Sequence, residues 1–217
     1  MKNYKVNIEV LSPLHLGAGH ADVVTDAEAV RDKYGLPFFP GKRLKGLLYE
    51  SALELAEMAS MAGLSGDKNW FSVDDVNRLF AQQVNKDGRK IDERDMDVKE
   101  SGIRVDNFYL PNYEELCAGW EYLQGKYSGL LTSLDVWDSY SEIRYQTAID
   151  KDTKTASEGT LRNLRAVESG TVFDGRILLI DDSNVNKNIL EKALMNLRYA
   201  GAKRNRGFGR IKCTIGK

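Results

Sequence analysis

A short run near the carboxyl terminus combines three kinds of residue that can hold a polyanion: arginines, glycines and an aromatic ring. The run, which we call the glycine loop, is Arg204-Asn205-Arg206-Gly207-Phe208-Gly209-Arg210. Glycine lets a backbone approach a phosphate closely, arginine binds phosphate through paired hydrogen bonds, and a phenyl ring can stack on a base. The same run also suits a tight turn with merely exposed arginines, and composition alone leaves both interpretations open.

A second basic segment follows a proline and opens a helical pattern. It reads Pro40-Gly41-Lys42-Arg43-Leu44-Lys45-Gly46. Cations in a first helical turn oppose the helix dipole, whereas free amide groups there attract anions, so a bound anion would account for them. The segment lacks the Ser or Thr that follows the lysine of a nucleotide-binding P-loop, which disfavours ATP hydrolysis.

Titratable residues gather in the loop that runs from Leu11 to about Val30. His20 could act as a general acid or base near neutral pH, and Asp26 could act as a base or hold a divalent cation. A loop carboxylate is ordinarily only solvated, and a single histidine is ordinarily structural, so without further context these simpler interpretations are favoured for each residue alone.

Hydrophobic periodicity predicts the elements that position these segments. Alternation predicts strands near 4–10 and 211–215, short or buried strands near 103–105 and 172–180, and the three- and four-residue spacing predicts helices near 41–62 and from Ser183 or Asn184 to about Gly201. The order strand, helix, strand, strand, helix, strand is that of an α+β, ferredoxin-like (RRM-like) fold with an antiparallel sheet. We therefore expect a single domain over 1–217, with its core in 1–62 and 103–217, an insertion at about 63–102, and a projecting hairpin at about 139–168.

Charge and composition exclude several classes of protein. The 217 residues contain 31 Lys plus Arg and 32 Asp plus Glu, a net charge of -1, so an anionic partner must be bound locally rather than through bulk charge. No apolar run approaches the ~20 residues that cross a bilayer, and Lys5 and Glu9 interrupt any signal-peptide pattern. We therefore expect a cytoplasmic protein that has no membrane span and no membrane partner. The only histidines are His15 and His20, and Cys117 and Cys213 lack ligand spacing, which excludes the usual four-ligand zinc site.

Four blocks in a fixed order resemble the RAMP superfamily of CRISPR-associated proteins, specifically the repeated backbone subunit of type III effector complexes. The matching blocks are Leu14-His15-Leu16-Gly17-Ala18-Gly19, then Asp26 to Asp32 followed by Tyr34 to Gly46, then Thr147 to Gly159, and Lys203 to Gly209. Each block is a weak signal, but as an ordered set they span nearly the whole chain.

The resemblance implies a guide-RNA-binding subunit that cuts bound target RNA. In it, the region 63–102 would be a lid, and the hairpin would be a thumb that displaces one base pair at regular intervals. Asp26, six residues before Asp32, matches the position that supports metal-dependent cleavage, so Asp26 would be both catalytic residue and metal ligand, with Mg²⁺ as the cofactor. The residues implied to bind RNA are His15, Gly17, Gly19, Lys42, Arg43, Lys45, Arg204, Arg206, Gly207, Phe208 and Gly209, and those of the thumb are Ile149, Asp150, Thr153, Thr155 and Glu158.

The partners implied by the resemblance are guide CRISPR RNA, single-stranded target RNA, further copies of the chain in a filament, and other type III subunits including the large polymerase-like one. Two alternatives remain open from the sequence. The chain could be a structural RNA-binding subunit that does not cut. It could instead be a stand-alone endoribonuclease that processes guide precursors with His20, although such enzymes usually carry two tandem ferredoxin-like units.

Overall fold

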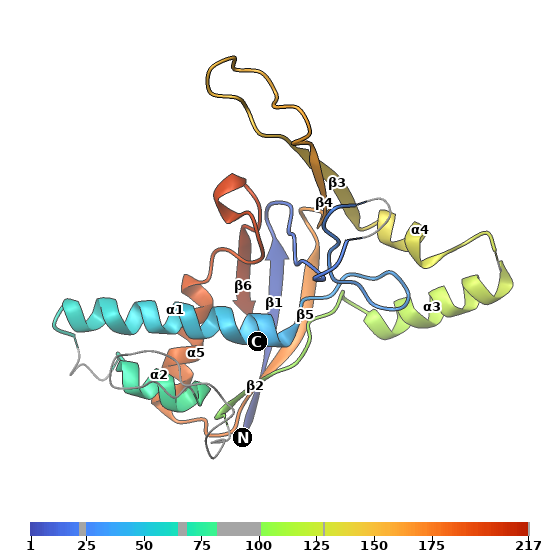
Figure 1. The fold of residues 1–217 in the computed structure, drawn as a ribbon. Coiled ribbons are helices and arrows are strands. Elements are labelled where there is room, and N and C mark those ends of the chain that lie inside the picture. Colours follow the sequence, from blue (N-terminus) through green and yellow to red (C-terminus); the bar gives the residue numbers. More distant parts are fainter. Residues whose placement is uncertain (22–24, 65–68, 82–100, 128, 217) are drawn as a thin grey trace, which may run out of the picture.

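The chain folds around one four-stranded antiparallel sheet with helices on one face and a hairpin that projects from its end (Figure 1). The computed structural model describes residues 1–21, 25–64, 69–81, 101–127 and 129–216. The strands are β1 (Lys2–Val10), β2 (Ile103–Val105), β3 (Ser141–Gln146), β4 (Arg162–Val167), β5 (Val172–Leu179) and β6 (Ile211–Ile215). The helices are α1 (Gly41–Met61), α2 (Val73–Phe80), α3 (Tyr113–Lys126), α4 (Ser133–Asp138), α5 (Asn184–Asn196) and the 3-10 turn η2 (Arg204–Arg206).

The main sheet has the order β2-β5-β1-β6, and each neighbouring pair is antiparallel. Its strand alternation follows the sequence pattern, since Val6 and Ile8 are buried while Lys5 and Glu9 are exposed. The mixed α/β class and the antiparallel pairing are thus confirmed.

Helices α1 and α5 cover the apolar face of this sheet and pack against each other. Leu44 and Leu48 of α1 and Leu190 of α5 are fully buried in the resulting core. Ser51 also donates a hydrogen bond of 3.0 Å to the carbonyl of Ala193, which ties the two helices together. The two helices thus pack as one layer on this face of the sheet.

The opposite face of the sheet is polar. Its strand positions include Lys5 and Asn7 on β1, Asp174 and Arg176 on β5, and Lys212 on β6, all from alternate positions that point away from the core. An aromatic side chain lies at the margin of this face, because Tyr109 pairs with Asp174 and stacks on Phe38 and Tyr113.

Strands β3 and β4 form a separate two-stranded sheet that carries the projecting loop 147–161. We call β3, β4 and this loop the hairpin. It lies within the range 139–168 that the sequence predicts for a projecting hairpin, and it rises beyond the end of β1 (Figure 1).

Two regions depart from or escape the sequence predictions. The predicted insertion at 63–102 lies largely outside the described residues, which include its helix α2 but not 65–68 or 82–100. The segment 113–131 has mixed sequence signals that predict no single element, and it contains α3, a helix of 14 residues with none of them buried. A helix that lies on the surface of the core without burying a continuous stripe has no strong periodic signal.

A close approach inside the core gives a stability prediction. A Cβ atom at Gly175 would overlap the ring of Phe108, whereas a Cβ at Gly119 in α3 would meet no atom within 4 Å. We expect Gly175→Ala to lower the free energy of unfolding by about 1–3 kcal/mol through overpacking. Gly119→Ala should raise it by up to about 1 kcal/mol, because alanine favours a helix interior. Urea unfolding of the two variants measures both, and equal effects would contradict the packing described here.

Candidate nucleic-acid interface

The loop between β1 and α1, residues 11–40, is fastened to β4 by paired backbone hydrogen bonds. Leu14 and Val167 exchange two bonds of 2.9 Å. His15 is buried, with 6% of its surface exposed, and its Nδ1 lies 2.7 Å from the carbonyl oxygen of Arg165. Its own carbonyl accepts a bond of 3.0 Å from the amide of Ala202. His15 therefore joins this loop, the hairpin and the approach to the glycine loop, which is the structural role expected of a lone buried histidine.

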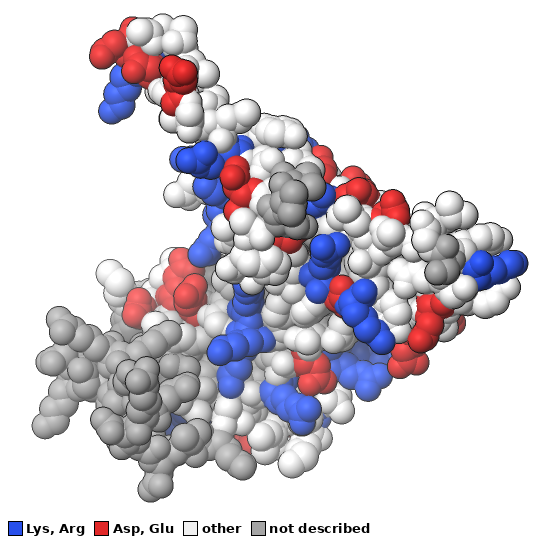
Figure 2. Space-filling model, turned by 45° about the vertical axis from the view of Figure 1, so that its right-hand side comes forward, with Lys and Arg blue, Asp and Glu red and all other residues white. Residues whose placement is uncertain are grey.

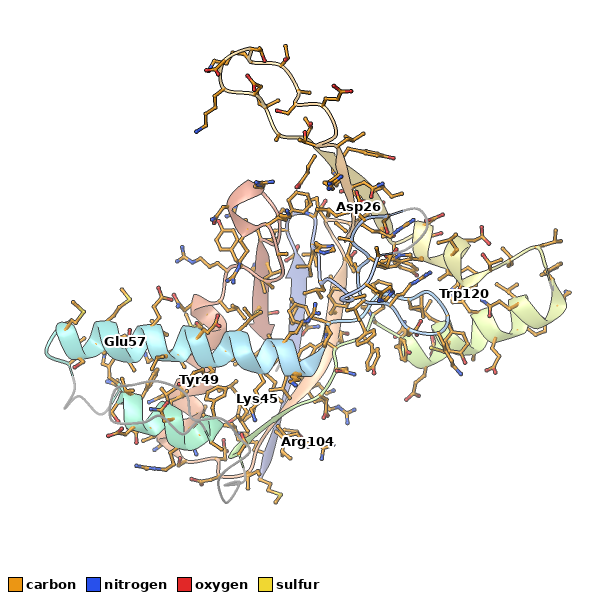
Figure 3. All side chains as sticks on the ribbon, viewed as in Figure 1. Asp26, Lys45, Tyr49, Glu57, Arg104 and Trp120 are labelled. Carbon is orange, nitrogen blue, oxygen red and sulfur yellow. The ribbon has the colours of Figure 1, made fainter. Side chains whose placement is uncertain are left out.

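Asp26 lies at the base of the hairpin, beside β4 (Figure 3). Its carboxylate oxygen Oδ2 accepts a bond of 2.8 Å from the amide of Asn163, and its own amide donates to Oδ1 of Asn163 at 2.7 Å. The residue is exposed. Asp26 is thus an exposed residue whose carboxylate and backbone amide each form one hydrogen bond to Asn163, not a freely rotating side chain on a loop.

A buried charged cluster lies next to Asp26. Glu28 and Arg165 are 2% and 4% exposed, with Oε2 and Nε 3.7 Å apart. The Glu28 carboxylate also accepts from Nε1 of Trp137 at 2.8 Å and from Oγ1 of Thr25 at 3.0 Å. The Arg165 guanidinium donates to Asp138, and to Oγ of Ser141 at 3.2 Å. The cluster connects the β1–α1 loop, α4 and the hairpin.

The glycines of the glycine loop are needed by the backbone itself. Gly209 has a φ of +76°, and a Cβ there would overlap the carbonyl of Ala200. Gly207 also has a positive φ, of +82°, but no atom lies within 4 Å of its missing side chain. Phe208 is 9% exposed and packs with Leu164, Ala166 and Ala27. The turn interpretation therefore accounts for Gly209 and for most of the Phe208 ring, but not for the exposed Arg204 and Arg206.

A pocket of about 880 Å³ lies between the glycine loop and the hairpin. Its cationic lining residues are Arg144 and Arg162 from the strands of the hairpin, with Lys203 and Arg206 from the carboxyl-terminal segment. Arg206 also donates to Oε1 of Gln146 at 3.3 Å, so the two walls touch. Four cations around one hollow make this pocket the strongest candidate for binding a phosphate backbone.

The two faces of the hairpin differ. Residues directly opposite in a ladder share a face, which places Arg144 with Leu164, and Tyr145 with Asn163 on the other side. The cations thus share their face with the cluster around Phe208, whereas Asn163, the partner of Asp26, belongs to the other face. In Figure 2, acidic side chains gather toward the tip of the hairpin with basic atoms beside them, and further basic side chains lie near its base.

The basic residues of α1 are divided between two sides of the helix. Arg43 donates to the carbonyl of Gly17, next to His15. Lys45 instead donates to Oγ of Ser101 at 2.8 Å, on the side that faces β2 (Figure 3). Positions 43 and 45 are about 200° apart around a helix, so they cannot share a face. Lys42 is exposed in the first turn. Arg43 is therefore the cation of this segment that the structure links to the β1–α1 loop.

The tip of the hairpin is ordered by a small network around Asp150. Its Oδ1 accepts from the amides of Asp152 and Thr153 at 2.9 and 2.8 Å and from the Thr153 hydroxyl at 3.0 Å. Hydrogen bonds from Thr153 lower the pKa of Asp150 below its usual range. Thr155 bonds to Thr153 at 2.8 Å, and Ile149 is 59% exposed. Glu158 is also exposed, as are Asp152, Lys151 and Lys154, so the tip presents an apolar side chain together with both acidic and basic ones.

The remaining predicted residues lie near these elements. Gly17 would place a Cβ 3.1 Å from Nε2 of His15, and Gly19 has a φ of +86° with open space around it. His20 is exposed, and its carbonyl accepts from the amide of Glu28 at 3.2 Å. Asp22 falls outside the described residues.

The surroundings of Asp26 limit what kind of metal site it could form. In the described ranges, no three His, Cys, Asp or Glu side chains come together as a metal cage. Mg²⁺ is often bound through only one or two carboxylates together with substrate phosphates and water. An exposed carboxylate held in place by Asn163 fits a shared site of that kind.

Sequence reasoning placed Glu28 only among the titratable residues of the first loop, and it missed Arg165 and Asn163. Glu28 stands between Ala27 and Ala29, and Arg165 between Leu164 and Ala166. A single charge inside an apolar stretch is the pattern of buried, paired charges, and could have indicated the pair. Nothing in the sequence indicates that Asn163 meets Asp26.

The chain is similar to known proteins over nearly its whole length. A family model of the RAMP superfamily matches residues 7–212, so the chain belongs to the RAMP superfamily. A search of curated proteins found no match. Two solved structures share the fold across 99% of this chain and 97% of theirs. One is the cryo-EM structure of the Type III-B Cmr-beta bound to cognate target RNA (15% identity, TM-score 0.65), and the other is its apo state (12% identity, TM-score 0.61). No described helix has the length and apolar character needed to cross a membrane.

The two glycines of the loop should respond differently to alanine. Gly209→Ala combines a left-handed φ with overlap on the Ala200 carbonyl, and should lower the free energy of unfolding by about 2 kcal/mol or more. Gly207→Ala should lower the free energy of unfolding by only about 1 kcal/mol, the cost of a left-handed φ, because its Cβ would meet no other atom. Chemical unfolding of both variants measures the difference, and a Gly209→Ala variant as stable as the parent would disprove the close approach.

Proposed function

We propose that this chain is a guide-RNA-binding backbone subunit of a type III CRISPR effector complex and that it cuts bound target RNA at Asp26. Membership of the RAMP superfamily and a fold shared with a chain of a type III-B complex that binds target RNA support the proposal. In this proposal the β2-β5-β1-β6 sheet with α1 and α5 is the ferredoxin-like core, the hairpin is the thumb, and 63–102 is the lid.

One observation carries the proposal: the hairpin has a cationic pocket on one side and the bonded Asp26 on the other. A strand whose phosphates contact Arg144, Arg162, Lys203 and Arg206 follows the base of the hairpin. A second strand paired with it meets the hairpin, which stands between the pocket and Asp26. The guide therefore occupies the pocket, and the target passes the carboxylate.

The hairpin supplies alignment for the cutting step. A nucleotide that is displaced from stacking can rotate its 2′-hydroxyl into line with the neighbouring phosphorus, and this alignment accounts for much of the barrier in such reactions. Ile149 is well placed to replace the lost stacking, because it is exposed near a tip that Asp150 has already ordered.

Asp26 is the residue that would hold a divalent cation, taken here as Mg²⁺, with the target phosphate supplying further ligands. When bound, such a cation stabilises negative charge on phosphate oxygens. The chain itself orients the carboxylate through Asn163, and Arg165 and Glu28 hold the backbone on either side. Copies of the chain along one guide, and other subunits including the large polymerase-like one, complete the proposed assembly.

Asp26→Asn tests the cleavage assignment. The amide oxygen of asparagine can still accept from the Asn163 amide, so the loop should stay in place while the charge is lost. We expect cutting of target RNA to fall at least about 100-fold, since metal-assisted charge stabilisation supplies several kcal/mol and each 1.36 kcal/mol is tenfold. Guide binding should be unchanged, and Glu168→Gln, on an exposed side chain near the hairpin, serves as the control.

Full cutting by Asp26→Asn would instead overturn the assignment of cleavage to Asp26, and a parent complex that binds target RNA without cutting it would identify a structural subunit. Cutting of repeat RNA that resists a chelator and is lost in His20→Ala would indicate the guide-processing alternative. That alternative expects two tandem sheets, whereas the described residues form one four-stranded sheet of this order.

Arg206→Ala tests the pocket. Each phosphate contact on a single strand contributes about 0.7 to the slope of log affinity against log salt, so the variant should lose about that much of the slope and bind guide RNA more weakly at every salt concentration. Lys187→Ala on α5, which removes an exposed cation paired with Glu191, is the matched control. Equal slopes for Arg206→Ala and the unmodified chain would contradict RNA binding in this pocket.

A further inference from the structure

The buried pair of Glu28 and Arg165 is costly to maintain. Removing a carboxylate and a guanidinium from water is unfavourable, and well-packed apolar residues often stabilise a fold equally well. Within the described residues, Nε of Arg165 has no hydrogen-bond acceptor and faces Glu28 at 3.7 Å. A pair that adds little stability but admits only one arrangement is suited to specifying geometry.

The geometry that this pair would specify is the register between residues 26–28 and β4. The amide of Arg165 donates to the carbonyl of Ala27 at 3.0 Å, and Ala27 pairs with Leu164 in parallel orientation. This register turns Ala27 toward the apolar cluster of Leu164, Ala166 and Phe208, and turns Glu28 toward Arg165. The two bonds between Asp26 and Asn163 exist only in this register.

A slip of one residue would reverse these directions, because side chains alternate along an extended segment. Glu28 would then enter the apolar cluster without a cation, and Arg165 would lose its buried carboxylate. Unpaired buried charges are strongly disfavoured, so the pair penalises the slipped arrangement far more than an apolar pair could.

We propose that Glu28 and Arg165 are positioning residues that fix the register of the β1–α1 loop against β4 and so hold the Asp26 carboxylate beside the hairpin. The inference rests on the proposed function for its effect on cutting. Its effect on the register is independent of RNA and of metal.

Glu28→Gln is the test, because glutamine removes the charge but keeps one oxygen that can accept from Nε1 of Trp137, while its amide nitrogen can donate to the Thr25 hydroxyl. In the free protein we expect the amides of Asn163 and Arg165 to exchange hydrogen at least about tenfold faster, with β1 unchanged. In the guide-loaded complex the maximal cutting rate should fall about 100-fold, the cost of misplacing a reacting group, while KM for target and guide affinity stay within about twofold. Glu191→Gln, which breaks an exposed pair of the same 3.7 Å separation on α5, should change none of these.

The outcomes separate the two ideas. If Glu28→Gln keeps slow hydrogen exchange at residues 163 and 165 and also cuts normally, the positioning role is overturned, regardless of the result for Asp26→Asn. If Glu28→Gln exchanges hydrogen fast at these two residues while Asp26→Asn cuts normally, the register role is upheld and the cleavage assignment is overturned. If Glu28→Gln fails to fold, Thr25→Val removes one 3.0 Å bond to the same carboxylate and should produce a smaller, equally local rise in exchange. A rise spread evenly over β1 and β4 in Thr25→Val would overturn the inference.

Discussion

The architecture of the interface depends on the attachment of the β1–α1 loop to β4. Paired backbone bonds at Leu14 and Val167, and the contact of His15 with the Arg165 carbonyl, join two segments that are about 150 residues apart in sequence. Because His15 also accepts from Ala202, the same short segment sets where the glycine loop begins. The positions of the pocket, the hairpin and the Asp26 carboxylate therefore all depend on this one attachment, and a displacement there would move all three together.

This joint explains how a nearly neutral chain can present a strongly cationic hollow. The cations of the pocket come from β3, β4 and the carboxyl-terminal segment, which are distant in sequence. Asp150, Asp152 and Glu158 lie at the far end of the hairpin, together with Lys151 and Lys154. The gathering of four cations around one pocket, not net charge, is thus the source of local attraction for an anion.

The sequence predicted most of the fold, because the core elements carry strong periodic signals. Val6 and Ile8 on β1 and the apolar stripe of α1 are examples in which burial follows the pattern directly. The site was less predictable. The pairing of Asp26 with Asn163 depends on register between distant segments, and the division of Arg43 from Lys45 depends on how α1 packs, so neither follows from residue type and spacing. The assignment of Asp26 itself came from resemblance to a family, not from its local chemistry.

Strand β3 also has a consequence for how the molecule behaves at high concentration. Among the described residues its ladder partner is β4 alone, so its outer edge is open to a strand of another chain. Charged side chains protect such edges, and β3 carries Glu142 and Arg144 joined by an ion pair of 2.6 Å. The projecting hairpin can thus remain extended in solvent without seeding edge-to-edge aggregation.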